Sequence, residues 1–471
     1  MYERLNKLKI LLFILGIKTQ LFGQGENPLE WSQVRQQLLQ YHPIARSAAL
    51  LDREATAALL RARGGFDPKA FSEYSAKDFK GKNYYSHAQA GLKVPTWAGL
   101  EIKGTYSTAS GNFLNPESNL PSNGQAALGF SWTLGQGLLM DERRANLRQA
   151  KIGIGQNAAN RDAVLNDLVQ AAAQTYWDWV LYDNQLAVAN EALRQAVLRL
   201  DAVRESYIRG DKPALDTLEA FIQVQTRQLD QNEALAAAQK SKIALQYFYW
   251  AASNTPVDTA SIRLAPLLAT GIYPSVSQLD SLLSEAMRQH PDLRYYNANL
   301  QSLAVDRKLK LEKRKPILDV NYNILGSAWS FFPTEGVTGA GVLVNDLKWG
   351  LDFSYPIPNR KARGDLQLAD IKIDQVNLKI AEKRQSIDNK IRQYATQLNI
   401  LSQQAATYRA LVENYRLLLD AEITKFQIGE SSVFLINTRE QKWLETRMKY
   451  LKLLAEYRET EAALRWAVGV P

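Results

Sequence analysis

The sequence predicts a mainly α-helical protein with a membrane β-barrel, in which very long coiled-coil helices adjoin a small number of membrane-type strands. Three observations in the 471-residue chain support this prediction. The chain is internally duplicated, its helices carry a sustained heptad repeat, and its strands alternate apolar with polar residues. Together they describe one helix–strand–helix unit that occurs twice.

The duplication is visible when the chain is compared with itself. Two long, ordered correspondences occur, and the offset between them changes once, within the strand section. The matched positions are YHPIARSA (41–48) with QHPDLRYY (289–296), Pro68 with Pro316, Leu147 with Leu366, Tyr207 with Phe426, and Gly210 with Gly429. This pattern indicates a repeated unit whose first copy has the longer strand section.

The repeat predicts the domain organisation. The expected domains are a signal peptide (1–24), a first repeat (25–252), a linker or equatorial segment (253–276) and a second repeat (277–471). Strands are expected at 68–134 and 317–356, and long helix pairs at 141–252 and 361–467. The first copy also has alternating stretches at 86–94 and 100–110, which fit either an added hairpin or an extracellular extension.

The heptad repeat is clearest in the second copy. Its apolar positions recur in steps of three and four over more than fifty residues, as in a coiled-coil seam. They include Leu366, Ala369, Ile380, Ile387, Ile391, Leu398, Leu401, Ala405 and Leu419. In the first copy a helix over 141–207 would be on the order of 100 Å long at about 1.5 Å per residue. No compact globular domain needs a helix of that length.

The strands alternate in the way that membrane barrels require. In the segment 347–355, Leu347, Trp349, Leu351, Phe353 and Tyr355 are separated by small or polar residues. Such a strand can face lipid on one side and water on the other. Taken alone, the same alternation also fits a half-buried strand of a soluble sheet. The secretory signal and the aromatic residues at strand ends favour the membrane interpretation. Because the strands of one chain are too few to close a wide barrel, several chains must associate and contribute strands to the same barrel.

The composition of the chain excludes several kinds of site and partner. Basic residues precede a short apolar run at 10–17, which is typical of a cleavable secretory signal. Cysteine is absent, which excludes disulfides, thiolate metal sites and a lipidated N-terminal cysteine. The net charge of +9 becomes +6 when the four basic residues and one acid of 1–24 are removed. Acids interleave with the basic residues, so a nucleic-acid partner is not expected.

Catalytic and cofactor motifs are not recognisable in the sequence. The chain has three histidines, of which His42 and His290 precede prolines at equivalent helix starts. We interpret these two as structural residues. Neither a phosphate-binding glycine loop nor a dinucleotide fingerprint is present, and no enzyme activity, metal or cofactor is expected.

The chain resembles the TolC family of outer-membrane efflux and secretion channels. The most specific segments are the two strand-to-helix junctions, FSYPIPNRKARGDLQLADIKI (353–373) and FSWTLGQGLLMDERRANLRQAKI (130–152), and the turns YIRGDKPALDTLEA and FQIGESSVFLINTRE. The resemblance implies a homotrimer in the outer membrane of a Gram-negative bacterium, with a twelve-stranded β-barrel and a periplasmic α-barrel. It also implies a periplasmic adaptor (membrane fusion protein) and an inner-membrane pump of the RND or ABC type as partners.

Three sets of residues are candidates for function. The tip turns, where the resemblance implies adaptor docking, contain Arg209, Gly210, Asp211, Gly429, Glu430 and Ser431. Acids that the resemblance places at the periplasmic aperture are Asp216 and Glu219, which equally fit ordinary first-turn acids of a helix. Residues expected to face outer-membrane lipid are Trp132, Phe130, Tyr322, Trp349, Phe353 and Tyr355.

The expected function is a passive exit duct for a tripartite efflux pump or a type I secretion system. A periplasmic coiled-coil adaptor or scaffold is the alternative, since it accounts for the heptads although not for the strands. A wide, water-filled duct has little chemical selectivity, so the sequence does not identify the transported substrate.

Overall fold

The computed structural model describes residues 28–116, 119–258, 279–328 and 346–470. The expected signal peptide, 1–24, and most of the expected linker lie outside the described residues. The first copy contains α2 (Trp31–Tyr41), α3 (Pro43–Arg63), the 3₁₀ helix η1 (Gly64–Phe66), β1 (Lys69–Phe79), β2 (Lys82–Pro95), β3 (Leu100–Ser110), β4 (Gln125–Gly135), α4 (Glu142–Ile208) and α5 (Ala214–Gln246). The second contains α6 (Leu279–Gln289), α7 (Pro291–Glu312), β5 (Ile317–Ser327), β6 (Leu347–Ser354), α9 (Arg360–Gln427) and α10 (Val433–Val468). The repeated order of elements confirms the predicted duplication.

The chain divides into two compact units, and each takes segments from both repeats. One unit consists of 1–46, 165–279 and 390–471, and the other of 47–164 and 280–389. The boundary falls inside α4 and α9, which have 67 and 68 residues. No described helix is both long enough and apolar enough to span a lipid bilayer.

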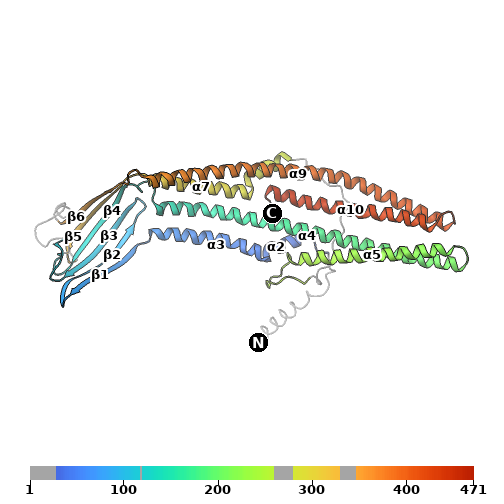
Figure 1. Ribbon diagram of the computed structural model, residues 1–471, viewed down its shortest axis with the longest axis horizontal. Helices are drawn as coiled ribbons and strands as arrows, with labels where there is room; N and C mark the ends of the chain where they lie inside the picture. Colours follow the sequence, from blue (N-terminus) through green and yellow to red (C-terminus); the bar gives the residue numbers. More distant parts are fainter. Residues whose placement is uncertain (1–27, 117–118, 259–278, 329–345, 471) are drawn as a thin grey trace, which may run out of the picture. The chain divides into compact units, whose positions relative to one another are not determined.

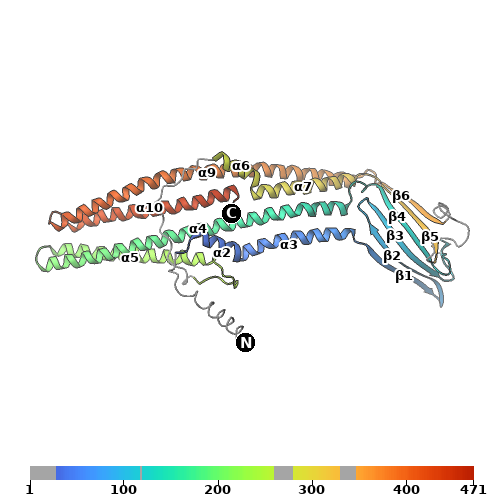
Figure 2. The same ribbon diagram turned by 180° about the vertical axis from the view of Figure 1, so that it is seen from behind.

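The sheet lies wholly in the second of these units. Its strand order is β1-β2-β3-β4-β5-β6, and every neighbouring pair is antiparallel (Figures 1 and 2). The alternating stretches at 86–94 and 100–110 therefore form a hairpin, β2–β3, inserted in the plane of the sheet between β1 and β4. The twelve strands that the resemblance implies correspond to four per chain in a trimer, whereas the described residues of this chain form six. The inserted hairpin accounts for the difference.

The predicted heptad positions form the helix contacts. Leu366, Ala369, Ile380, Ile387, Ile391, Leu398, Leu401, Ala405 and Leu419 are all buried along α9. In the first unit, Tyr176 and Trp179 of α4 pack with Val34 of α2, Leu245 of α5 and Leu454 of α10. Burial of such large side chains stabilises the helix pairs far more than local propensity does.

The two HP junctions have a structural role. In both, proline occupies the first turn of a helix, where its missing N–H costs nothing. The histidine Nδ1 accepts a hydrogen bond from a backbone N–H of that turn, Ile44 for His42 and Asp292 for His290, each at 3.2 Å. These histidines therefore serve as helix caps.

Candidate functional site: a two-faced sheet and two helical turns

One face of the sheet is apolar. Directly opposed residues in antiparallel strands project to the same face, and Phe130 opposes Tyr322, which opposes Trp349. The rings of Phe130 and Tyr322 stack with centroids 5.7 Å apart. Trp132 and Phe353 lie on the same face by the same pairing, and both are exposed, as Trp349 is. The predicted lipid-facing set thus shares one surface.

Tyr355, the sixth residue of the predicted lipid-facing set, follows the end of β6 and is also exposed. It therefore lies at the strand end rather than within the sheet. Aromatic residues with a polar tip are typical of such positions at a membrane–water interface.

The opposite face of the sheet is polar and hollowed. A cavity of about 450 Å³ is lined mainly by polar side chains, among them His87, Gln89, Lys103, Asn321, Asn323 and Lys348. The predicted alternation is therefore present in three dimensions. Strands β1 and β6 are the two outer strands, each with one neighbour among the described residues. Such open edges present unpaired backbone groups that favour strand pairing with another chain.

The two turns predicted at Gly210 and Gly429 have the same backbone geometry. Both glycines have positive φ, 82° and 83°. In each turn the residue after the glycine donates to a carbonyl five positions back, Asp211 to Ser206 and Glu430 to Lys425, at 2.9 Å. This is a Schellman-type helix end, which requires the left-handed conformation that glycine adopts without strain.

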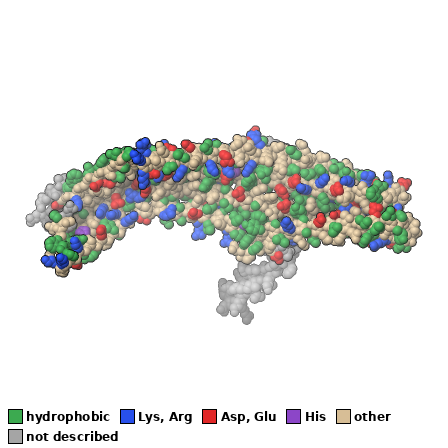
Figure 3. Space-filling model, in the orientation of Figure 1, with side chains coloured by type: hydrophobic (Ala, Val, Ile, Leu, Met, Phe, Trp, Pro, Cys, Tyr) green, Lys and Arg blue, Asp and Glu red, His purple; other side chains and the backbone are tan. Residues whose placement is uncertain are grey.

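The turns lie at one end of their unit and expose apolar side chains (Figure 3). Ile208, Leu215, Ile428 and Phe434 are each more than 60% exposed. Arg209 pairs with Glu205 at 2.8 Å, and the Ser431 hydroxyl donates to Glu422. The predicted docking residues are therefore surrounded by apolar side chains that the sequence analysis did not single out.

The two predicted aperture acids lie at the start of α5. Asp216 is in its first turn, and both acids are half-buried. The Glu219 carboxylate accepts from the Asn437 amide of α10 at 3.5 Å, and Asn437 in turn accepts from Arg199 of α4 at 3.0 Å. Glu219 is thus part of a polar chain that links three helices.

A buried charge cluster continues this chain and was missed by sequence reasoning. Arg199 binds Glu440 of α10 through both guanidinium Nη atoms, at 3.0 and 2.7 Å. Arg227 of α5, only 3% exposed, lies 3.9 Å from the same carboxylate and 2.7 Å from Asp230. Glu440 therefore connects the helix pair of the first copy to that of the second. The cluster draws on α4, α5 and α10, so no local spacing could have identified it.

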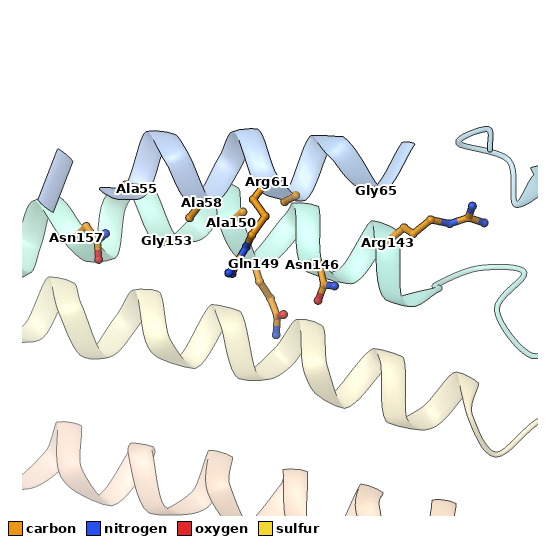
Figure 4. Close-up of a pocket in the computed structure, with 11 residues that line it drawn as sticks. Ala55, Ala58, Arg61, Gly65, Arg143, Asn146, Gln149, Ala150, Gly153 and Asn157 are labelled. Carbon is orange, nitrogen blue, oxygen red and sulfur yellow. The ribbon is translucent and has the colours of Figure 1, made fainter. Parts of the chain in front are cut away.

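A groove between α3 and α4 carries no evident chemistry. It has a volume of about 500 Å³ and is lined largely by small residues, including Ala55, Ala58, Ala150 and Gly153, with polar Gln149 beside them (Figure 4). None of its lining residues is acidic. In the part of the chain that the structure describes, no group of three or more His, Cys, Asp or Glu residues could hold a metal ion.

The sequence matches the model of the family described as Outer membrane efflux protein, over residues 97–248 and 282–470. The chain belongs to the outer membrane efflux protein family. No curated protein sequence matches it. It is an outer-membrane efflux channel of the TolC type from a Gram-negative bacterium, not an enzyme. Membership also sets aside the alternative of a periplasmic adaptor.

Solved structures of outer-membrane channels have the same fold. The MtrE channel of Neisseria gonorrhoeae, in its open state, is 14% identical with a TM-score of 0.67, and the match covers 93% of this chain and 89% of that one. VceC of Vibrio cholerae is 13% identical with a TM-score of 0.65, and the match covers 93% of this chain and 96% of that one. CmeC of Campylobacter jejuni is 15% identical with a TM-score of 0.64, and the match covers 96% of this chain and 90% of that one. The efflux channel therefore has its family's fold at low sequence identity.

The unit made of 1–46, 165–279 and 390–471, called the helical unit below, contains a carboxyl group with a pH-dependent effect on stability. Burial, followed by repulsion from Asp178 and Glu456, raises the pKa of Glu459 to about 7. Its ordinary value is 4.5, so between these values the folded state binds more protons than the unfolded one, and stability falls as pH rises. We expect the melting midpoint to decrease between pH 5 and about pH 8. Glu459→Gln should reduce this decrease and raise the midpoint at the higher pH, whereas Glu413→Gln, on an exposed part of α9, should leave it unchanged. Equal pH dependence in both variants would contradict the assignment.

Proposed function

We propose that this efflux channel is, as a homotrimer, the exit duct of a tripartite efflux pump or a type I secretion system. An inner-membrane pump of the RND or ABC class supplies the energy, and a periplasmic adaptor joins it to the duct. The duct itself conducts passively. The observation that best supports the proposal is a sheet with one apolar face, one polar face and two open edges.

Closure of the barrel follows from these edges. Six strands are too few for a water-filled barrel, whereas three copies of the six-stranded sheet supply eighteen. In this arrangement β1 of each protomer pairs with β6 of the neighbouring protomer, so no strand edge of the trimer stays unpaired. The apolar face, with Trp132, Phe130, Tyr322, Trp349 and Phe353, then contacts lipid, and the polar face lines the lumen. Tyr355 lies at the membrane interface.

The turns are the proposed docking surface for the adaptor. They carry Arg209, Gly210, Asp211, Gly429, Glu430 and Ser431, surrounded by exposed apolar side chains. Lys212 lies 4.5 Å from the centre of the Phe426 ring, so the turn of the first copy contacts the helix of the second. Exposed apolar side chains with a few charges around them are typical of protein-binding surfaces.

Asp216 and Glu219 are the proposed constriction. Only the first copy supplies acids here, since the equivalent residues of the second are Leu435 and Thr438. A ring of carboxylates from three copies would attract cations and narrow the passage.

Planar bilayers test the duct and its constriction together. The purified protein should give discrete single-channel steps, and the double variant Asp216→Ala, Glu219→Ala should raise conductance and lower cation selectivity. The double variant Asp201→Ala, Glu205→Ala, on the exposed side of α4, is the charge-matched control. Complete lack of conductance would contradict the duct. Unaltered conductance and selectivity in the Asp216, Glu219 variant would contradict only the constriction.

A further inference from the structure

A line of lysines crosses the sheet at one level. The register of the five strand pairs connects Lys69 to Lys93, Lys93 to Lys103, Lys103 to Gly129, Gly129 to Asn323, and Asn323 to Lys348. Each of the six strands thus contributes one residue, and four of the six are lysines. We call Lys69, Lys93, Lys103 and Lys348 the lysine row.

The lysine row lies on the polar face. Lys103 and Lys348 line the hollow of that face. The ammonium groups of Lys93 and Lys103 lie 4.9 and 5.6 Å from the centre of the Phe71 ring. The row that contains Phe71 therefore lies on the same face of the sheet as the lysine row. The neighbouring row on the other face is Ile102, Phe130, Tyr322 and Trp349, which are apolar. The apolar residues and the lysines are therefore on opposite faces of the same strands.

The positive charge of the row is not balanced within it. Like charges placed directly opposite each other destabilise a sheet, and Lys69, Lys93 and Lys103 are direct neighbours. Among the residues that the structure describes, no carboxylate forms an ion pair with any lysine of the row. The row thus places like charges side by side with no ion-paired carboxylate, and such an arrangement favours a ligand of opposite charge.

The acids of the polar face are set apart from the row. Glu101 is two residues from Lys103 toward the helices and lies 4.0 Å from Arg143. Asp319 and Asp352 oppose each other one row nearer still to the helices. On the other side, Phe71, Gly91, Thr105, Ala127 and Leu325 form an uncharged row. Two residues beyond Phe71, Glu73 opposes Gln89 on the same face, so the lysine level lies between acidic residues on either side along the strands.

We propose that the lysine row is a binding level for multivalent anions, such as solutes carrying phosphate or carboxylate groups, inside the outer-membrane part of the duct. The inference rests on the proposed function, since it takes the polar face to line the lumen. Three copies bring twelve lysines to the wall, four from each. Ammonium groups in low-dielectric walls concentrate anions and delay their exit. The effect weakens with salt, because the screening length is about 10 Å at 0.1 M.

Binding of inorganic triphosphate to the detergent-purified protein tests the proposal. We compare the natural protein with the variant Lys69→Gln, Lys93→Gln, Lys103→Gln, Lys348→Gln by titration calorimetry, at about 10 mM and about 500 mM salt. The charge-matched control is Lys82→Gln, Lys308→Gln, Lys361→Gln, Lys379→Gln, four exposed lysines away from the row. Oligomer stability on gels shows that each variant is assembled.

The row variant should lose affinity for triphosphate about tenfold or more at low salt, and its remaining affinity should vary less with salt than that of the natural protein. The control should bind within about twofold of the natural protein. Equal losses in both variants, or unchanged affinity in the row variant, would overturn the proposal. Triphosphate binding and channel conductance are separate measurements. A protein that binds triphosphate through the lysine row but gives no conductance would contradict the proposed duct, and it would not contradict anion binding by the row.

Discussion

Glu440→Gln should destabilise the helical unit by about 3–5 kcal/mol, because it removes the negative charge from between two arginines. Arg199 and Glu440 form a bidentate pair, and Arg227 lies beside them with almost no exposure to water. The glutamine keeps the shape of the side chain but leaves the largely buried Arg199 guanidinium with only amide acceptors in place of its carboxylate. Thermal unfolding followed by circular dichroism measures the loss directly.

The same substitution should also affect transport. Glu440 ties α4 and α5 to α10, close to the two turns. Loss of these ion pairs should make the helix ends near the two turns more mobile. Single channels in bilayers should then spend more time open. Glu445→Gln is the control on the same helix, since Glu445 pairs with exposed Lys442 at 3.1 Å and should contribute less than about 1 kcal/mol. Similar losses for Glu440→Gln and Glu445→Gln would show that the buried cluster has no special role.

Trp349→Arg should impair assembly in the outer membrane, at a cost of about 2–4 kcal/mol for each copy near the middle of the bilayer. Trp349 is 69% exposed on the apolar face of β6. In the proposed barrel it meets lipid, where a guanidinium has no counter-charge. The fraction of protein recovered as a folded oligomer from outer membranes is the measurement.

The adjacent residue supplies a matched control for this prediction. Gly350 lies on the polar face, and a Cβ added there would meet nothing within 4 Å. Gly350→Arg introduces the same charge at nearly the same depth, but into the proposed water-filled lumen, and assembly should be close to normal. If both arginine variants assemble equally well, the apolar face does not contact lipid.

The helices and the alternation of the strands could be predicted from the sequence because both are periodic. Heptad residues such as Ile391 and Leu398 are buried, as the repeat requires. Trp349 and Phe353 share a face because successive residues of a strand alternate in direction. Gly210 and Gly429 could be located because a left-handed helix end needs glycine.

The remaining features depend on partners that are distant in the sequence. The segments 86–94 and 100–110 looked like strands, but only their pairing places them inside the sheet between β1 and β4. That pairing also aligns Lys69 with Lys348, which are far apart in the chain. The Glu440 cluster likewise draws on three helices. Register between elements, rather than pattern within them, determines these sites.

Disulfide cross-linking between β1 and β6 tests most directly whether copies pool their six strands. The natural chain has no cysteine, so introduced pairs report without background. Each double variant combines one cysteine in β1 with one in β6 on the same face of the sheet. The pairs are Ser72→Cys with Leu351→Cys and Ser75→Cys with Asp352→Cys, and neighbouring positions scan the register between the two strands. Oxidation in intact membranes should yield a covalent trimer for a subset of pairs, while each single-cysteine variant stays monomeric on denaturing gels. Only monomers in every double variant would contradict a barrel closed by three copies of this sheet.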